Sequence, residues 1–246
     1  MRVLIFSDMH LHNWAYGSTL VGGMNSRLKA QAAVLDQIAV ASEEADHVVF
    51  CGDLFHTHGK IDAAVLKVAY EGFSRIAEAS NTYIDVLVGN HDTADKSMAT
   101  HALHWMNAFN YGASPGQGDI FRIIDRPLHN SDTDYDDPYS FLPYTEDKAV
   151  IEKFFAECGE VCFMHQGVAK VPMGSGFLID EILTQDMIPD HVKHVFTGHY
   201  HQHNRVSDKL TVVGSTVQHN WADEGDPRGW VWYDNETGGK IGRAHV

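Results

Sequence analysis

The chain has 246 residues, of which 44% are hydrophobic and 21% charged, and its formal net charge is −15 at pH 7. These values are typical of a globular α/β domain, and no apolar run approaches the ~18 residues of a membrane-spanning helix. The first apolar run is too short for a signal peptide, so we expect a cytoplasmic protein with no membrane contact. Taken alone, the acidic charge argues against a nucleic-acid partner, because phosphate backbones favour Lys and Arg.

The first half of the chain alternates between strand and helix patterns. Strands are predicted at 2–6, 47–50 and 83–88, and helices at 25–45 and 62–79. Within the first helix, Leu28, Ala32 and Leu35 recur at the spacing of one helical face. This alternation predicts parallel strands joined by helical crossovers.

The second half is richer in strands. Strands are predicted at 161–164, 192–197, 210–213 and 230–233, and helices at 98–109 and 145–157. We expect Thr145 to cap the second of these helices, and the acidic residues 130–138 to form a surface loop. Trp221, Trp230 and Trp232 are expected to lie in the core or in late strands.

Five short segments carry metal-binding side chains in a fixed order, and four of them directly follow a run rich in Val, Ile, Leu or Phe. They are Asp8-Met9-His10, Gly52-Asp53, Gly89-Asn90-His91-Asp92, Met164-His165-Gln166 and Gly198-His199-Tyr200-His201. This position predicts side chains at the carboxyl ends of strands, where α/β sheets gather ligands. Each segment alone is a weak signal, but all five in order indicate two metal ions and phosphate-ester hydrolysis.

The spacing within the segments predicts how the side chains converge. Asp8 and His10 are two residues apart, so in an extended segment they project to the same side, and the same holds for His199 and His201. Asp53 follows a glycine at a strand end and has two oxygens to share, so we expect it to bridge the two ions.

The remaining donors indicate which metals fit. Asn90 offers a carbonyl oxygen and His165 an imidazole. Imidazole and carboxylate together suit Mn, Fe or Zn better than Mg or Ca.

The pattern Asp-x-His, Gly-Asp, Gly-Asn-His-Asp, His and Gly-His-x-His resembles the calcineurin-like metallophosphoesterases from Asp8 to His201. The resemblance implies an α/β fold, a four-layer α/β/β/α sandwich with two mixed sheets. It also implies that His91 is a catalytic histidine at the scissile phosphate, and that Asp92 orients it. The implied ligands are Asp8, His10, Asp53 and His201 for one ion, and Asp53, Asn90, His165 and His199 for the other.

A narrower resemblance concerns the substrate. Gly52-Asp53-Leu54-Phe55-His56 is similar to SbcD-type (Mre-eleven-type) DNA repair nucleases, including phage versions, as are 165–168, 174–177 and 214–221. In that family, the histidine that matches His56 helps to position DNA for exonuclease cleavage. The resemblance implies DNA as substrate, Mn as the expected metal with Fe, Zn or Mg as options, an SbcC-type ATPase partner and a homodimer.

The end of the chain carries a separate expectation. Residues 241–246 equal one reading frame of a common sequencing adapter. We therefore expect a nuclease domain over 1–240 and an adapter-derived tail over 241–246, with the family's C-terminal DNA-binding cap missing.

The sequence thus predicts a two-metal phosphodiesterase that cleaves DNA as an exonuclease or also as an endonuclease. A small-substrate esterase for cyclic nucleotides, dinucleotides or phosphoproteins is an alternative that the acidic charge favours, whereas His56 and residues 218–220 favour the nuclease. A non-catalytic scaffold predicts missing ligands, and none is missing. The loop with His12, Trp14 and Tyr16 could stack on a base near the metals, although an ordinary packed loop is favoured.

Overall fold

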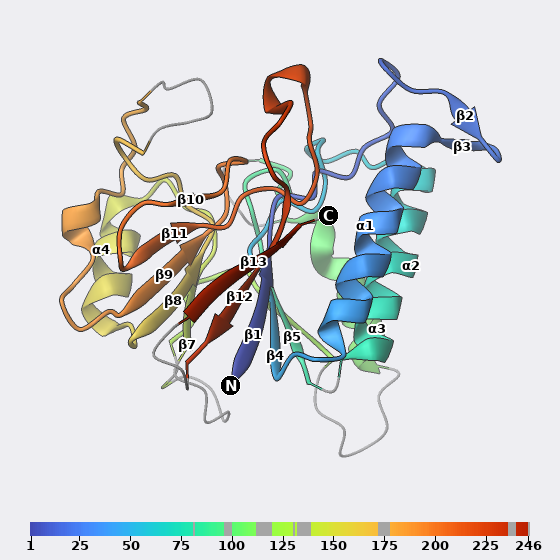
Figure 1. Cartoon of the computed structure of the whole chain (residues 1–246). Helices are drawn as coiled ribbons and strands as arrows, with labels where there is room; N and C mark the ends of the chain where they lie inside the picture. Colours follow the sequence, from blue (N-terminus) through green and yellow to red (C-terminus); the bar gives the residue numbers. More distant parts are fainter. Residues whose placement is uncertain are drawn as a thin grey trace.

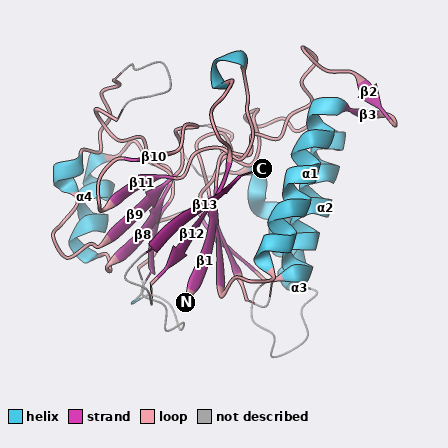
Figure 2. Cartoon of the chain, viewed as in Figure 1, coloured by secondary structure: helices cyan, strands magenta, loops and turns pink. Residues whose placement is uncertain are grey.

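The computed structural model describes residues 1–80, 82–95, 100–111, 120–129, 131, 139–171, 178–235 and 240–245. Two β-sheets face each other within these residues, and helices cover their outer faces (Figure 1). Figure 2 shows α1 (Ser26–Ser42) and α2 (Ala63–Ala79) on one side of the molecule and α4 (Lys148–Glu157) on the other. This is the predicted four-layer α/β/β/α arrangement.

The first sheet is mixed and has the order β13-β12-β1-β4-β5-β6. Strands β1, β4, β5 and β6 are parallel, whereas β12 is antiparallel to both β1 and β13. Of these parallel strands, β1, β4 and β5 are the crossover-linked set that the first half of the sequence predicted. Their bounds are β1 Arg2–Phe6, β4 His47–Phe50, β5 Ile84–Leu87, β6 Phe121–Ile124, β12 Gly229–Asp234 and β13 Lys240–His245.

The second sheet is also mixed, in the order β10-β11-β9-β8-β7. Its strands β7, β8, β9 and β11 are parallel, and the short β10 is antiparallel to β11. The bounds are β7 Tyr139–Leu142, β8 Val161–Met164, β9 His194–Thr197, β10 Asn204–Arg205 and β11 Leu210–Val212.

Side-chain alternation along the strands builds three apolar layers. In β1, Leu4 and Phe6 face α1 and α2, whereas Val3 and Ile5 face the space between the sheets. This happens because successive side chains of a strand point to opposite faces. Phe163 of β8 lies in the layer between the sheets, and a third layer packs α4 against the outer face of the second sheet.

Polar side chains fix where the helices begin. Asn25 caps α1 by accepting from two backbone N–H groups, and Asp62 caps α2 in the same way with one. The predicted cap of α4 is wrong: Asp147 accepts from the backbone of Ala149, and α4 begins at Lys148. The hydroxyl of Thr145 accepts instead from the backbone N–H of Asp147, so it holds the turn before the helix.

Several predicted elements differ from the structure. Within 98–109, the described part is a 3-10 helix, η1 (Ala102–Met106), followed by α3 (Asn107–Tyr111). The expected acidic loop over 130–138 lies outside the described residues except for 131. The sequence did not predict the strands β6, β7 and β10, or the short hairpin of β2 (Leu20–Val21) and β3 (Met24–Asn25).

The end of the chain forms a strand. Residues 240–245 are β13, paired with β12 from Gly229 opposite His245 to Asp234 opposite Lys240. This pairing does not bear on where residues 241–246 come from, so an adapter origin stays a prediction.

Among the described residues, no helix is both long and apolar enough to span a bilayer.

We predict that Phe163→Ala destabilises the fold by about 3–5 kcal/mol, because it leaves a cavity between the sheets. The Phe163 ring is fully buried and lies 5.3–5.6 Å, centroid to centroid, from the rings of Tyr139, Phe141 and Phe196. Denaturant unfolding measures the loss, and Leu20→Ala, at a residue 79% exposed, is the matched control. A loss below about 1 kcal/mol for Phe163→Ala would contradict a packed layer between the sheets.

Candidate active site

All five motif segments follow a strand, and all five strands run parallel within their sheets. Since parallel strands bring their carboxyl ends to one edge, the segments from both sheets meet there. The segments follow β1 (Asp8, His10), β4 (Asp53), β5 (Asn90, His91, Asp92), β8 (His165) and β9 (His199, His201).

The backbone at this edge is left-handed rather than extended, which corrects the sequence-based expectation. The φ angles are 53° at Asp8, 41° at His10, 60° at Asp53 and 79° at His199. Such angles cost non-glycine residues of order 1–3 kcal/mol each, and they persist where the surroundings determine them. Here the backbone N–H of Asp8 donates to the backbone oxygen of Gly52, and the N–H of His10 donates to the backbone oxygen of Asp53, each at 3.0 Å.

Two motif glycines are required by close approach. A Cβ atom at Gly89 would collide with the carboxylate and backbone of Asp53. A Cβ atom at Gly198 would collide with Ser7 and with the backbone of Cys51. Gly89 therefore lets the loops after β4 and β5 of the first sheet come close, and Gly198 lets the loop after β9 of the second sheet approach the first.

Asp53 lies at the centre of the converging side chains. Its Oδ2 is 3.5 Å from Nε2 of His10 and 3.3 Å from Nε2 of His165. Its Oδ1 accepts from the backbone N–H of His91 at 2.8 Å. The carboxylate thus faces donors from both sheets, as a bridging ligand must.

The other donors form two close groups around Asp53. Oδ1 of Asn90 is 3.1 Å from Nε2 of His165 and 2.9 Å from Nδ1 of His199. On the other side, the Nε2 atoms of His10 and His201 are 3.0 Å apart. The ligand atoms of Asp8, His10 and His201 lie within 4.8 Å of one another, as do those of Asp8, Asp53 and His165.

These residues fit divalent metal ions. Oδ1 of Asp8 is fully buried and has no hydrogen-bond partner among the described residues. A buried carboxylate oxygen without such a partner is costly unless a cation neutralises it. Imidazole nitrogens and carboxylate and amide oxygens at this spacing form a donor set for such a cation.

Electrostatics keeps several of the histidines in the form that binds metal. Burial lowers the pKa of His10 and His201, and burial together with His165 lowers the pKa of His199 to about 4. These imidazoles are therefore neutral at pH 7, as metal ligands must be. Burial raises the pKa of Asp8 to about 7.

His165 behaves differently from the other histidines. Burial alone would lower its pKa, but the neighbouring carboxylate of Asp53 outweighs this effect and raises the pKa to about 9. His165 and Asp53 thus form a buried ion pair when no cation is bound, and a metal must displace the proton.

The ring of His91 is held beside the donors by its neighbours. Its Nδ1 is 2.7 Å from the carbonyl oxygen of His56. The ring stacks on His56 at 5.6 Å and on His58 at 4.6 Å between centroids. Because a carbonyl only accepts, Nδ1 carries the hydrogen and Nε2 is the atom that can gain or lose a proton.

The predicted role of Asp92 needs correction. Its carboxylate accepts from the backbone N–H groups of Gly89, Asp53 and Leu54 at 2.9–3.0 Å, and from that of Phe55 at 3.3 Å. The carbonyl of His56, not Asp92, makes the contact that orients His91. Asp92 instead ties the loop after β4 to the loop after β5.

Sequence reasoning missed His219 and Arg228. Nε2 of His219 lies 3.1 Å from the backbone oxygen of Asp8, and its ring packs edge-on against His10 and His201 at 5.1 and 4.8 Å. The sequence marks residues 218–220 only through their resemblance to phage nucleases. No local pattern in the sequence marks an arginine that acts through backbone oxygens.

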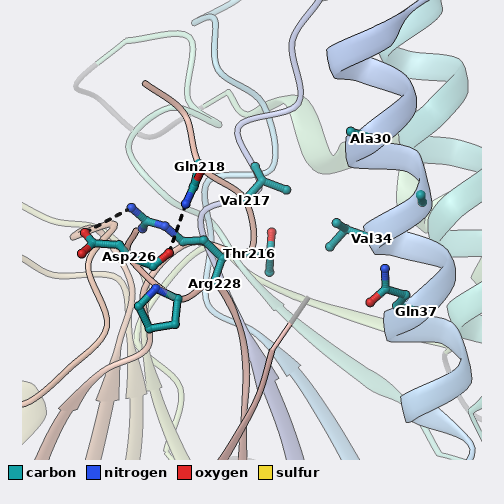
Figure 3. A pocket seen from close by; sticks show the side chains of 10 residues that line it. Ala30, Val34, Gln37, Thr216, Val217, Gln218, Asp226 and Arg228 are labelled. Atoms are coloured by element: carbon teal, nitrogen blue, oxygen red, sulfur yellow. Dashed lines mark hydrogen bonds and ion pairs between the residues drawn. The ribbon is translucent and has the colours of Figure 1, made fainter. Parts of the chain in front are cut away.

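Arg228 supports His201 from behind. Its guanidinium donates to the backbone oxygen of His201 and to the hydroxyl of Ser215, and it pairs with Asp223 at 3.0 Å and Asp226 at 3.6 Å. Figure 3 shows Arg228 and Asp226 beside a cavity of about 630 Å³ between α1 and the segment 216–228.

Comparison with known proteins shows which family the chain belongs to. A family model described as calcineurin-like phosphoesterase matches residues 1–203, which contain all five segments. The SbcD component of the nuclease SbcCD from Bacillus subtilis is 36% identical over 112 residues, which is 45% of this chain and 27% of that protein.

Two viral proteins match more of the chain. Proteins named as phosphoesterases, 244L of Invertebrate iridescent virus 6 and 078R of Invertebrate iridescent virus 3, are each 26% identical. These matches cover 75% and 71% of this chain and 63% and 48% of the viral proteins. The chain therefore spans about two thirds or less of the curated relatives that it matches.

A solved structure described as a 5′-nucleotidase from Staphylococcus aureus covers 99% of this chain and 52% of its own, with a TM-score of 0.46 and 12% identity. So distant a likeness adds nothing to the assignment.

We predict that Mn²⁺ binding at pH 8 releases about one proton, because His165 with a pKa of about 9 must become neutral. The affinity for Mn²⁺ should fall about tenfold per pH unit as the pH drops from 9 to 7. It should fall more steeply below pH 7, where Asp8 is also protonated. Calorimetry in buffers of different ionisation enthalpy measures the release, and His165→Asn should remove it. Heats that are equal in all buffers would contradict the buried ion pair.

We predict that Asp92→Asn lowers the free energy of unfolding of the metal-free protein by about 2 kcal/mol or more, because an amide cannot accept from all four N–H groups. The melting temperature in thermal unfolding and the affinity for Mn²⁺ should both fall. If Asp92 only oriented His91, turnover alone would fall, with stability and Mn²⁺ affinity unchanged.

Proposed function

We propose that this chain, which belongs to the calcineurin-like phosphoesterase family, is a metal-dependent phosphodiesterase that hydrolyses DNA. The observation that carries the proposal is the convergence of donors from both sheets on Asp53, with His91 held beside them. Cleavage from DNA ends as an exonuclease, with or without endonuclease activity, is the proposed reaction.

The proposal assigns the donors to two sets that share Asp53. The first is Asp8, His10, Asp53 and His201, and the second is Asp53, Asn90, His165 and His199. The closeness of Asp8, His10 and His201, and of Asn90 to His165 and His199, supports this assignment. Divalent ions held there would make a water molecule more acidic and would stabilise negative charge on the phosphoryl oxygens. Among candidate ions, the mixture of imidazole, carboxylate and amide favours Mn²⁺, with Fe, Zn or Mg as options.

His91 supplies the proton transfer in this proposal. With Nδ1 donating to the carbonyl of His56, a protonated His91 presents its other N–H, at Nε2, to the scissile phosphate. That group can donate to a phosphoryl oxygen as negative charge grows, and can pass its proton to the leaving oxygen. Stacking on His56 and His58 fixes the plane of the ring during this transfer.

Two observations support DNA as the substrate. The ring of His56 lies against His91 and also against Trp14 at 4.4 Å, so it lies beside the site at which a phosphate would bind. The relative with the highest identity among those described above is a component of a nuclease. With this substrate, the proposal includes an SbcC-type ATPase partner and a homodimer.

A small-substrate esterase is the second candidate. The viral relatives cover more of the chain and are named only as phosphoesterases. The net charge of −15 also favours a substrate smaller than a nucleic acid.

We predict that the purified protein degrades linear DNA when Mn²⁺ is supplied, and that His91→Ala lowers the rate at least about 100-fold without loss of bound metal. Nuclease assays and metal analysis of the same samples measure both, with Tyr70→Ala on α2 as the control. A metal-loaded protein that leaves DNA intact and cleaves small diesters would point to the second candidate. Full activity in a metal-loaded His91→Ala protein would exclude the role of His91.

A further inference from the structure

A second hollow lies beside the metal-binding residues and contains none of the proposed ligands. Its volume is about 400 Å³, within the range of sites for small molecules and parts of larger ones. It lies between the loop after β1 and the segment that carries the 3-10 helix η4 (Trp221–Asp223). Trp14, Tyr16, Gly17, Arg27, Gln218, His219, Asn220 and Trp221 line it.

Three aromatic side chains line this cavity, and two of them are largely exposed. Tyr16 and Trp221 are each 77% exposed, so the expectation that Trp221 belongs to the core or a late strand is wrong. Trp14 is half-buried, and its ring lies against His56 at 4.4 Å. Large aromatic rings gathered around an open hollow indicate a binding surface.

Arg27 joins the two sides of the cavity and supplies a positive charge. Its guanidinium lies 4.7 Å from the centre of the Trp14 ring. It donates to the backbone oxygen of Tyr16 at 3.3 Å and to that of His219 at 2.7 Å. These contacts tie the ring of Trp14 and the backbone at Tyr16 and His219 to one side chain at the start of α1.

His219 connects the cavity to the metal site. The same residue that lines the cavity packs edge-on against His10 and His201 and lies 3.1 Å from the backbone oxygen of Asp8. Figure 1 shows the segment that carries η4 and the start of α1 at the same end of the molecule as the carboxyl end of β1. The cavity therefore borders the residues proposed to bind metal, with His219 in contact with both.

We propose that this cavity binds an unpaired nucleobase of the DNA strand whose phosphate lies at the metal site. This inference rests on the proposed function and names the form of its substrate. Bases of any sequence stack on aromatic side chains, and the exposed rings of Tyr16 and Trp221 offer such faces, while Arg27 adds a cation to the wall of the cavity. A base within a duplex cannot enter, so single-stranded or frayed ends are preferred.

The test compares two product-like probes that differ only in the base, deoxyadenosine 5′-monophosphate and deoxyribose 5-phosphate, on the Mn²⁺-loaded protein. We expect the nucleotide to bind about 5- to 100-fold more tightly, as stacking on aromatic rings allows. Trp221→Ala should reduce this preference to about the base-free level, and Trp221→Phe should restore most of it. Tyr70→Ala, an exposed aromatic residue on α2, is the matched control.

Thermal unfolding of each variant checks the fold, and the exposure of Trp221 predicts no change. Equal affinity for the two probes in the wild type, or an unchanged preference in Trp221→Ala, would overturn the inference. DNA cleavage without any preference for the nucleotide probe would contradict base binding in the cavity and leave the proposed function unaffected. Base preference without DNA cleavage would overturn the proposed function and assign the cavity to a free nucleotide instead of DNA.

Discussion

The site depends on the buried ion pair between the carboxylate of Asp53 and the imidazole of His165. A carboxylate removed from water costs several kcal/mol unless opposite charge and hydrogen bonds compensate. Here His165 supplies the charge, and the backbone N–H of His91 supplies a hydrogen bond. His165 comes from one sheet and Asp53 from the other, so the ion pair also joins the two halves of the sandwich. A cation at this point would replace a proton that His165 already holds.

The features around Asp53 follow from that constraint. Gly89 has no side chain because a Cβ atom there would occupy the space of the carboxylate. Asp92 collects four backbone N–H groups and so fixes the loop in which Asp53 adopts a left-handed conformation. Arg228 fixes the far side of the site through the backbone of His201. Strain in the loops is thus compensated by hydrogen bonds within the same site.

The sequence predicted the parts that depend on periodicity and on strand ends. Leu28 and Leu35 marked α1, and the runs before Asp8, Asp53 and His165 marked β1, β4 and β8, because buried strands and amphipathic helices repeat at fixed intervals. The position of the motifs directly after apolar runs therefore placed the donors at the correct edge of the sheets.

Long-range packing decided the rest, and a local pattern cannot report it. The left-handed angles at Asp8 and His10 depend on backbone partners that follow β4, more than 40 residues later in the chain. The roles predicted for Asp92 and Trp221 were wrong for the same reason. Asp92 accepts hydrogen bonds from a loop that is distant in sequence. Trp221 lies exposed at a cavity that two distant segments form.

The metal content of Asp53→Asn beside that of the wild type tests the central claim most directly. If Asp53 is shared by both ligand sets, the wild type binds two Mn²⁺ ions per chain after dialysis, and Asp53→Asn retains neither, while its fold, followed by circular dichroism, persists. Two ions retained by Asp53→Asn, or none bound by the wild type, would contradict a site centred on this carboxylate.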